Sequence, residues 1–330
     1  MTASLEPPPV TPRRVAILIA AYNAEATIER AIRSALAQPE VVEVCVIDDA
    51  SADNTREAAR ASDPGDGRLV VLRQEQNAGP SAARNRGLNV ISADWVGILD
   101  ADDFLLPGRI GKMLDSAADA DFVADEILRT PYPGDASAAQ SKLGEKRAEA
   151  KEERLIDFTT FVSGNTGKHH GADLGFVKPL MRRSFLARHG MRYRTNMRLG
   201  EDYEFYARAL ALGARFKIVP AAGYVSVDRE GSLSNKHEIA DLRALRDCDD
   251  DLSNVRALTA EERAALRRHR EGIDARLQWR IMIEAVKQRD VKQALGTFRS
   301  PTVSLFLAAR LAEQAWIRGP QRWLRADGEA

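Results

Sequence analysis

Acidic residues gather directly after two apolar segments in the first third of the chain. Asp48 and Asp49 follow the run 41–47 (VVEVCVI), and the tetrad 100–103 (DADD) follows the run 95–99 (WVGIL). Two carboxylates spaced Asp-x-Asp can face one hard divalent cation, which takes oxygen ligands and leaves positions for phosphate oxygens. Aspartate also suits turns and caps at strand ends. The spacing alone therefore leaves a metal site and a turn as alternatives.

Three further features could contact a nucleotide. The first apolar run exits into Ala20-Ala21-Tyr22-Asn23, where Tyr22 could stack on a base or belong to the core. The stretch 77–85 (NAGPSAARN) puts a glycine at an expected helix N-terminus, whose backbone N–H groups favour anions. Arg84 in that stretch could reach a phosphate or pair with an aspartate. Each feature has an ordinary structural explanation when it is taken alone.

A third group of acidic residues, the pair Glu201-Asp202, directly precedes the segment 203–212, whose apolar residues recur with a helical period. Carboxylates at a helix N-terminus complement the helix dipole, and a carboxylate is also a suitable general base. The adjacent His169 and His170 fall in a glycine-flanked stretch expected to be a loop. Two histidines without a third ligand make a poor metal site, so acceptor contact and plain surface both stay open for this pair.

Alternating strands and helices must position these residues. Expected strands at 15–21, 41–47, 68–72 and 95–99 are separated by expected helices at 26–38, after 55, and at 81–91. This alternation is typical of a parallel sheet covered by helices. Ligands of such sheets bind beyond the carboxyl ends of the strands, which is where the acidic residues fall.

The rest of the chain divides into segments of different character. Residues 129–154 are polar, without an apolar period, and predict a mobile insertion. A helix is expected at 203–212, strands at 215–220 and 224–228, and almost continuous helix from 241 onward. The expected organisation is a flexible leader 1–14, a catalytic domain 15–235 and a helical C-terminal extension 236–330.

Composition excludes several classes of protein. The 330 residues include 48 Lys+Arg and 48 Asp+Glu, and 44% are apolar. The chain is thus neither disordered throughout nor built as a nucleic-acid binder. Its two cysteines cannot form a disulfide framework or a zinc cage. No secretory signal pattern is visible, and the longest apolar run, 15–22, is too short to span a bilayer. A cytoplasmic location is expected.

Six segments in order resemble the family-2, GT-A-type inverting glycosyltransferases. They are ILIAAYN (17–23), VIDDASAD (46–53), NAGPSAARNRG (77–87), ILDADD (98–103), GEDYEFYARAL (200–210) and REGSLS (229–234). The resemblance covers about two thirds of the chain. It implies an α/β, GT-A fold with a Rossmann-like nucleotide-binding sheet, and a divalent metal cofactor, Mg²⁺ or Mn²⁺.

The resemblance also implies a role for each matching residue. Ala20, Tyr22 and either Asp48 or Asp49 would hold the uracil and ribose, while Gly79 and Arg84 would line the nucleotide pocket. Asp100 would contact the ribose and Asp102 the metal, with Asp103 as a neighbouring candidate. Asp202 would be the general base, and Arg229 would contact the diphosphate or the metal. Glu201, His169 and His170 are candidates for the acceptor side.

Among family-2 enzymes, the chain is most similar to bacterial exopolysaccharide enzymes of the succinoglycan type. This similarity implies transfer of glucose from UDP-glucose to a lipid-linked oligosaccharide, with inversion. A sugar-phosphate nucleotidyltransferase is one alternative, although it would require a glycine-rich basic loop that residues 21–24 do not supply. A non-catalytic nucleotide-binding scaffold is the other.

The C-terminal stretch 301–325 is basic and rich in Leu and Trp, and residues 256–330 carry 15 Arg+Lys against 9 Asp+Glu. A basic, Trp-bearing helix can lie on an anionic membrane surface. Packing on the catalytic domain or on a partner subunit is the alternative. With membrane contact, the protein would be peripheral on the inner face of the inner membrane.

Overall fold

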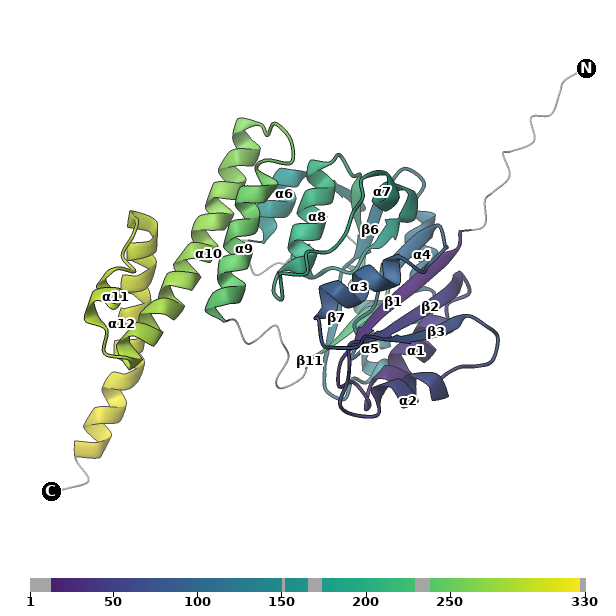
Figure 1. Ribbon diagram of the computed structural model, residues 1–330, viewed down its shortest axis with the longest axis horizontal. Coiled ribbons are helices and arrows are strands. Elements are labelled where there is room, and N and C mark those ends of the chain that lie inside the picture. Colours follow the sequence, from purple (N-terminus) through teal and green to yellow (C-terminus); the bar gives the residue numbers. More distant parts are fainter. Residues whose placement is uncertain (1–12, 150–151, 166–173, 229–237, 327–330) are drawn as a thin grey trace, which may run out of the picture. The chain divides into compact units, whose positions relative to one another are not determined.

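The computed structural model describes residues 13–149, 152–165, 174–228 and 238–326, the last ten of these by their backbone (Figure 1). Its contacts define two compact units. Unit 1 contains residues 1–157, 177–195 and 213–230, and unit 2 contains 158–176, 196–212 and 231–330. The chain therefore passes between the units several times. The segment with Glu201-Asp202 belongs to the same unit as the C-terminal helices, although the expected catalytic domain extends to residue 235.

Unit 1 contains the predicted parallel sheet. Four parallel strands stand in the order β3-β2-β1-β4: β3 (Leu69–Arg73), β2 (Val41–Asp48), β1 (Val15–Ala21) and β4 (Trp95–Ile98). The connections contain the helices α1 (Ile28–Leu36), α2 (Thr55–Ala61) and α3 (Pro80–Leu88). β1 is almost wholly buried, as expected for a continuous apolar run in a parallel sheet covered on both faces. The expected α/β fold is confirmed.

The sheet continues past β4 with mixed strand directions. In the described residues it has eight strands and adds β9 (Leu180–Arg182), β6 (Phe122–Asp125), β10 (Phe216–Val219) and β8 (Arg154–Ile156). β9 runs antiparallel to β4 and β6, and β8 runs antiparallel to β10. The helices α4 (Arg109–Asp115) and α7 (Arg183–Arg188) belong to the same unit.

A second, smaller sheet is formed by β5 (Phe104–Leu105), β11 (Tyr224–Asp228) and β7 (Leu128–Pro131). The helix α5 (Ala136–Ala148) belongs to it through a small apolar cluster that contains Ala139 and Leu143. Asp135 caps this helix by accepting hydrogen bonds from the N–H groups of Ser137 and Ala138. The segment 129–154, predicted to be a mobile insertion, thus contains a regular helix at 136–148. The buried residues of this helix are Ala139 and Leu143, one turn apart, and two apolar positions leave little periodicity in the sequence.

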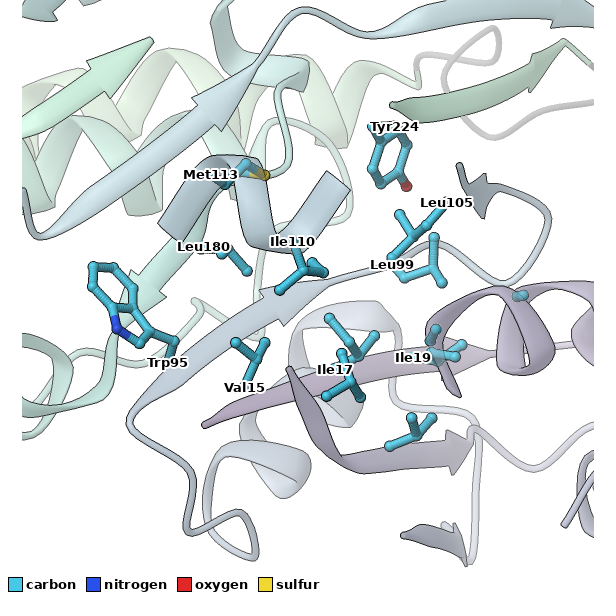
Figure 2. Close-up of a cluster of buried hydrophobic side chains, with 14 of the residues drawn as sticks. Val15, Ile17, Ile19, Trp95, Leu99, Leu105, Ile110, Met113, Leu180 and Tyr224 are labelled. Carbon is cyan, nitrogen blue, oxygen red and sulfur yellow. The ribbon is translucent and has the colours of Figure 1, made fainter. Parts of the chain in front are cut away.

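The main core of unit 1 fills the space between the sheet and the helices α1 and α4. Val15, Ile17 and Ile19 alternate along β1 toward this core, where Trp95, Leu99, Ile110, Met113 and Leu180 also lie (Figure 2). Close packing of this kind leaves the strands little freedom to shift. The core therefore holds the carboxyl ends of β1 and β4 in fixed positions.

Unit 2 is helical in the part of the chain that the structure describes. It contains α6 (Phe158–Gly164), the 3-10 turn Leu174–Phe176, α8 (Glu201–Ala211), α9 (Ile239–Leu252), α10 (Ala260–Lys287), α11 (Val291–Leu295) and α12 (Pro301–Ala326). The expected helical C-terminal extension is confirmed. α12 packs against α10 through Ala275, Met282, Val303 and Leu307. None of the described helices combines the length and apolar character needed to cross a bilayer.

Candidate active site

The carboxyl ends of β1, β2 and β4 lie at one edge of the sheet, which we name the donor edge. The chain runs from β3 to β4 through α3, so the direction of strand addition reverses between β1 and β4. Such a switch point is where open α/β sheets bind ligands. Ala20 is partly buried in β1, and Tyr22 just beyond it has 52% of its surface exposed. Tyr22 is therefore not a core residue.

The loops after β1 and β2 are bonded to each other. The side-chain oxygen of Asn23 accepts a hydrogen bond from the N–H of Ala52 at 2.9 Å, and the N–H of Asn23 donates to the hydroxyl of Ser51 at 3.0 Å. Asn23 and Ala50 both have positive φ, at 49° and 58°. The paired loops hold this unusual backbone in place and thereby fix the chain on either side of Tyr22.

Asp48 and Asp49 are buried, and their carboxylates bond to the loops at the donor edge. The two carboxylate oxygens of Asp49 accept hydrogen bonds from the N–H groups of Ala78 and Gly79, at 2.9 and 2.8 Å. One oxygen of Asp48 accepts from the N–H of Ser51 at 3.0 Å, and the other lies 3.5 Å from Nε of Arg73. In this structure both carboxylates hold neighbouring loops. Any nucleotide contact from them would be made beside these bonds.

Gly79 is the residue before α3 and has φ of 85° and ψ of 167°. An added Cβ would meet no atom within 4 Å, so space does not require glycine here. The backbone conformation does, because residues with a side chain rarely adopt it. Pro80 follows at the first position of the helix, where its lack of an N–H costs nothing.

Asp100 lies between two buried cations. Its carboxylate is 3.1 Å from Nη2 of Arg84 and 2.9 Å from Nζ of Lys178, and its own side chain is 35% exposed. Burial alone would raise the pKa of Asp100, but Lys178 and then Arg84 outweigh it and lower this pKa to about 2. Of the two roles left open for Arg84, the structure shows the aspartate pair.

Lys178 is a residue that the sequence analysis missed. It stands alone before β9, with no acidic neighbour in the sequence to indicate a partner. The antiparallel pairing of β9 with β4 brings it to the end of β4. The sequence contains no signal that could have found this contact.

Asp103, the neighbouring candidate, is buried and bonded to β11. The Tyr224 hydroxyl donates to it at 2.8 Å, the Val227 N–H donates at 2.9 Å, and the same hydroxyl accepts from the N–H of Asp100 at 3.2 Å. Burial, and then the charges of Asp100 and Asp102, raise the pKa of Asp103 to about 8. These bonds attach the tetrad 100–103 to β11.

Asp102 is partly buried, and its backbone carbonyl accepts a hydrogen bond from Arg30 at 3.1 Å. No group of three or more His, Cys, Asp or Glu side chains in the described residues could hold a metal ion by itself. A cation that takes one or two carboxylates and completes its shell with phosphate oxygens needs no such group. Burial is the main cause of the raised pKa of Asp103 and the charges of Asp100 and Asp102 add to it, so a cation bound at Asp102 would relieve part of this repulsion.

Asp202 lies in unit 2, in the first turn of α8, which we name the base helix. Gly200 precedes the helix with φ of 72°, Glu201 is partly buried at its first position, and Asp202 is buried. The N-terminal position places the carboxylate at the positive end of the helix dipole. The candidates Arg229, His169 and His170 lie outside the described residues.

The switch point, the acidic strand ends and the helix-covered sheet define an α/β protein whose ligand edge lies at the carboxyl ends of β1, β2 and β4. Comparison with known proteins identifies the family: residues 16–186 match Glycosyl transferase family 2. The chain is 45% identical over 287 residues to the succinoglycan biosynthesis protein ExoU of Rhizobium meliloti, covering 86% of this chain and 82% of ExoU. It is 34% identical over 324 residues to ExoO of the same organism, covering 91% and 87%. The chain belongs to glycosyl transferase family 2.

Solved structures confirm the fold. The mannosyltransferase PcManGT of Pyrobaculum calidifontis, in complex with GDP-Man and Mn²⁺, superposes with a TM-score of 0.58 and 17% identity, covering 97% of this chain and 85% of that one. TarS residues 1–349 of S. aureus, in complex with UDP-GlcNAc, superpose with a TM-score of 0.56 and 15% identity, covering 93% and 92%. The family match makes the protein a glycosyltransferase, and the solved structures show that it has a GT-A fold.

Proposed function

We propose that this glycosyltransferase moves glucose from UDP-glucose to a lipid-linked oligosaccharide during assembly of a succinoglycan-type exopolysaccharide, with inversion and with a divalent metal. The observation that carries the proposal is the 45% identity to a succinoglycan biosynthesis protein across most of both chains. The donor edge supports it, because it combines an exposed aromatic ring with carboxylates at a switch point. Family membership favours this function over the nucleotidyltransferase and scaffold alternatives.

On the donor side, Tyr22 would stack on the uracil and Asp100 would accept a hydrogen bond from the ribose. The ion pairs with Lys178 and Arg84 keep Asp100 charged and oriented for that contact. Asp102 would hold the metal, Mg²⁺ or Mn²⁺, which when bound neutralises charge on the diphosphate. Ala20 and Gly79 would border the nucleotide, with Arg229 as a further diphosphate contact.

On the acceptor side, Asp202 would act as the general base. The acceptor hydroxyl attacks the anomeric carbon from the face opposite the diphosphate, and Asp202 takes its proton as the new C–O bond forms. The bond between the anomeric carbon and the β-phosphate oxygen breaks, and UDP leaves with the electron pair. Attack from the opposite face inverts the configuration. Glu201, His169 and His170 are the proposed acceptor contacts.

The donor proposal is tested by calorimetric titration with UDP, with GDP and dTDP as controls, each with and without Mn²⁺. We expect UDP-selective binding that strengthens with Mn²⁺. An Asp102→Asn variant should lose the Mn²⁺ effect and keep metal-free UDP binding. Equal binding of the three nucleotides, or none, would contradict the donor assignment.

We also propose a cytoplasmic location with peripheral contact to the inner membrane through residues 301–325. Leu305 and Trp316 on α12 are 75% and 80% exposed, and Arg310 lies on the same helix. A helix that carries both exposed apolar side chains and cations suits an anionic lipid surface. The variant Leu305→Ser/Trp316→Ala should lose cosedimentation with phosphatidylglycerol vesicles but not UDP binding. Unchanged cosedimentation would contradict membrane contact through α12.

A further inference from the structure

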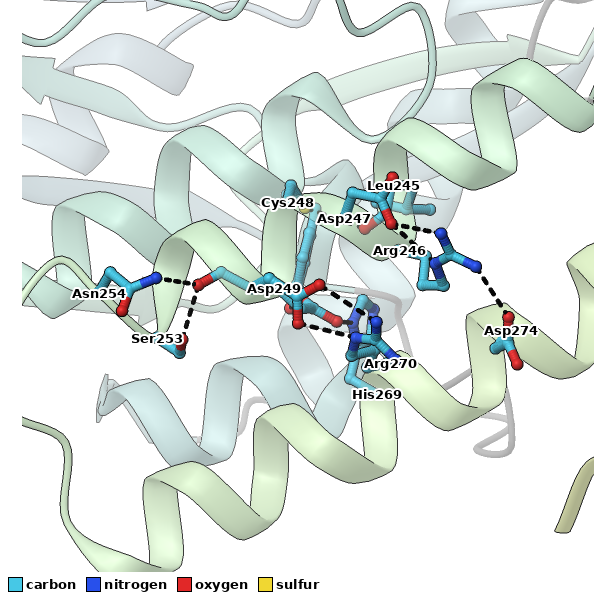
Figure 3. Close-up of polar contacts among 12 residues, drawn as sticks. Leu245, Arg246, Asp247, Cys248, Asp249, Ser253, Asn254, His269, Arg270 and Asp274 are labelled. Carbon is cyan, nitrogen blue, oxygen red and sulfur yellow. Dashed lines mark hydrogen bonds and ion pairs between the residues drawn. The ribbon is translucent and has the colours of Figure 1, made fainter. Parts of the chain in front are cut away.

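Three buried polar side chains meet where α8, α9 and α10 pack together, next to the proposed base. The Tyr203 hydroxyl donates to Oδ1 of Asp249 at 2.9 Å, and Nδ1 of His269 lies 2.7 Å from Oδ2 of the same carboxylate. Figure 3 shows Asp249 and His269 with their neighbours. Each of the three residues is at most 4% exposed. A buried carboxylate is tolerated only when it is well bonded, and here both oxygens have a partner.

Tyr203 is also held by its ring. It stacks against His269 of α10 with ring centroids 4.3 Å apart, and against Phe161 of α6 with centroids 5.8 Å apart. Burial, and then the charge of Asp249, raise the pKa of Tyr203 well above its ordinary value. The phenol therefore stays protonated and remains a hydrogen-bond donor to Asp249.

A second contact from α9 reaches the start of the base helix. A Cβ added to Gly200 would lie 2.5 Å from Cδ1 of Leu245, so α9 fits closely against the residue that precedes α8. Leu245 and Asp249 are four residues apart and therefore lie on the same face of α9. That face of α9 lies against Gly200, just before α8, and against Tyr203 within α8. The two positions flank Asp202 in the sequence.

We propose that Asp249, Tyr203 and His269 are positioning residues for the general base. They fix the first turn of α8, and Asp202 precedes Tyr203 in that turn. Successive helical residues point about 100° apart, so Tyr203 can be anchored toward α9 and α10 while Asp202 faces another direction. This inference rests on the proposed role of Asp202. It gives the C-terminal helices a part in catalysis, because a displacement of about 1 Å in a reacting group costs on the order of 10²-fold in rate.

The variant Asp249→Asn tests the inference, and Asp250→Asn is its matched control. Asp250 is the next residue of α9 and also bonds to α10, through Nε and Nη2 of Arg270 at 2.8 and 3.1 Å, but its side chain is 58% exposed. The control therefore removes a carboxylate between the same two helices without touching Tyr203. Figure 3 shows Arg270 beside His269.

The measurement is UDP release from UDP-glucose, with a lipid extract of Rhizobium meliloti as the acceptor source, below the unfolding temperature of every variant. We expect Asp249→Asn to lower kcat by roughly tenfold or more, with the KM for UDP-glucose and the Kd for UDP unchanged. Asp250→Asn should change none of these values. A purely structural role would not separate kcat from donor affinity in this way.

Two results would overturn the inference. One is a folded Asp249→Asn protein with wild-type kcat, and the other is a parallel loss of kcat and UDP affinity. Tyr203→Phe keeps the ring and removes the hydroxyl, so it decides the question if Asp249→Asn does not fold. An unchanged kcat of Tyr203→Phe would again overturn the inference.

Asp202→Asn belongs in the same series, because it tests the proposed base itself. If Asp202→Asn still transfers sugar, the assignment of Asp202 as the base is wrong. If Asp202→Asn is inactive while Asp249→Asn keeps wild-type activity, only the positioning role is wrong.

Discussion

The donor edge and the base helix differ in where their supporting residues come from. At the donor edge, the ends of β1 and β2 are held within the first hundred residues, where Asp49 bonds to Gly79 and the loop of Tyr22 bonds to the loop after β2. The end of β4 is held by Lys178 and Tyr224, which belong to the same compact unit. The base helix is held by Asp249 and His269, of which Asp249 follows its partner Tyr203 by 46 residues in the sequence. The two regions also belong to different compact units. Donor binding and proton transfer should therefore respond separately to substitution.

The largest expected effect is on the base. Asp202→Asn keeps the size of the side chain and removes its ability to take a proton, so kcat should fall by roughly 10²–10⁴-fold. The Kd for UDP should stay unchanged, because the donor edge lies in the other unit. Kinetics and calorimetry on the same preparation check both values. A joint loss of transfer and UDP binding in a folded protein would break the proposed separation.

Lys178→Met changes the donor edge and leaves the base helix untouched. It removes one of the two cations beside Asp100 and leaves Arg84, so the free energy of unfolding should fall by about 1–3 kcal/mol. We expect less than for a fully buried pair, because solvent reaches Asp100. UDP binding should weaken. Urea denaturation and UDP titration provide the two measurements.

Lys146→Met is the control for that variant. Lys146 pairs with Glu126 at 2.9 Å but is 44% exposed, so its loss should change stability by less than about 1 kcal/mol. Equal effects of the two lysine substitutions would show that the burial of Lys178 carries no energetic weight.

Gly79→Ala should destabilise unit 1 through the backbone alone. The added methyl meets open space, but φ of 85° with ψ of 167° costs a residue with a side chain about 1–3 kcal/mol. Gly144→Ala is the matched control, since it also meets open space but lies inside α5, where alanine should stabilise by about 0.5–1 kcal/mol. Thermal unfolding measures both. The same sign for the two variants would contradict the conformational argument.

The smallest expected effect is a pH dependence in unit 2. Hydrogen bonds from Arg256 outweigh burial and, with one from the backbone N–H of Thr259, lower the pKa of Glu262 to about 2. Because the folded pKa lies below the unfolded value, the stabilisation is present above pH 4.5 and is lost as the pH falls through about 2. Glu262→Gln should thus be less stable than wild type at pH 7, by about 1 kcal/mol. The difference should shrink in urea titrations at pH 3, and a constant difference would contradict this origin.

Much of the fold could be predicted because local patterns suffice for it. The run VAILIAA is apolar at every position and becomes a buried central strand, and the acidic residues after β2 and β4 fall at strand ends as expected. The helix α5 was missed because its docking depends on Ala139 and Leu143, which meet β7 and β11 only in the folded chain.

The sequence by itself determined the alternating strands and helices, the acidic strand ends and the motif order that indicates the family. Only the tertiary structure decided which polar and charged side chains are paired. It set Lys178 against Asp100, Tyr224 against Asp103, and Tyr203 with His269 against Asp249. The physical reason is that strand and helix formation depends largely on neighbours along the chain. The energy of a charged or polar group depends instead on its burial and on partner atoms about 3 Å away. Those distances are set by packing between segments that no spacing in the sequence relates.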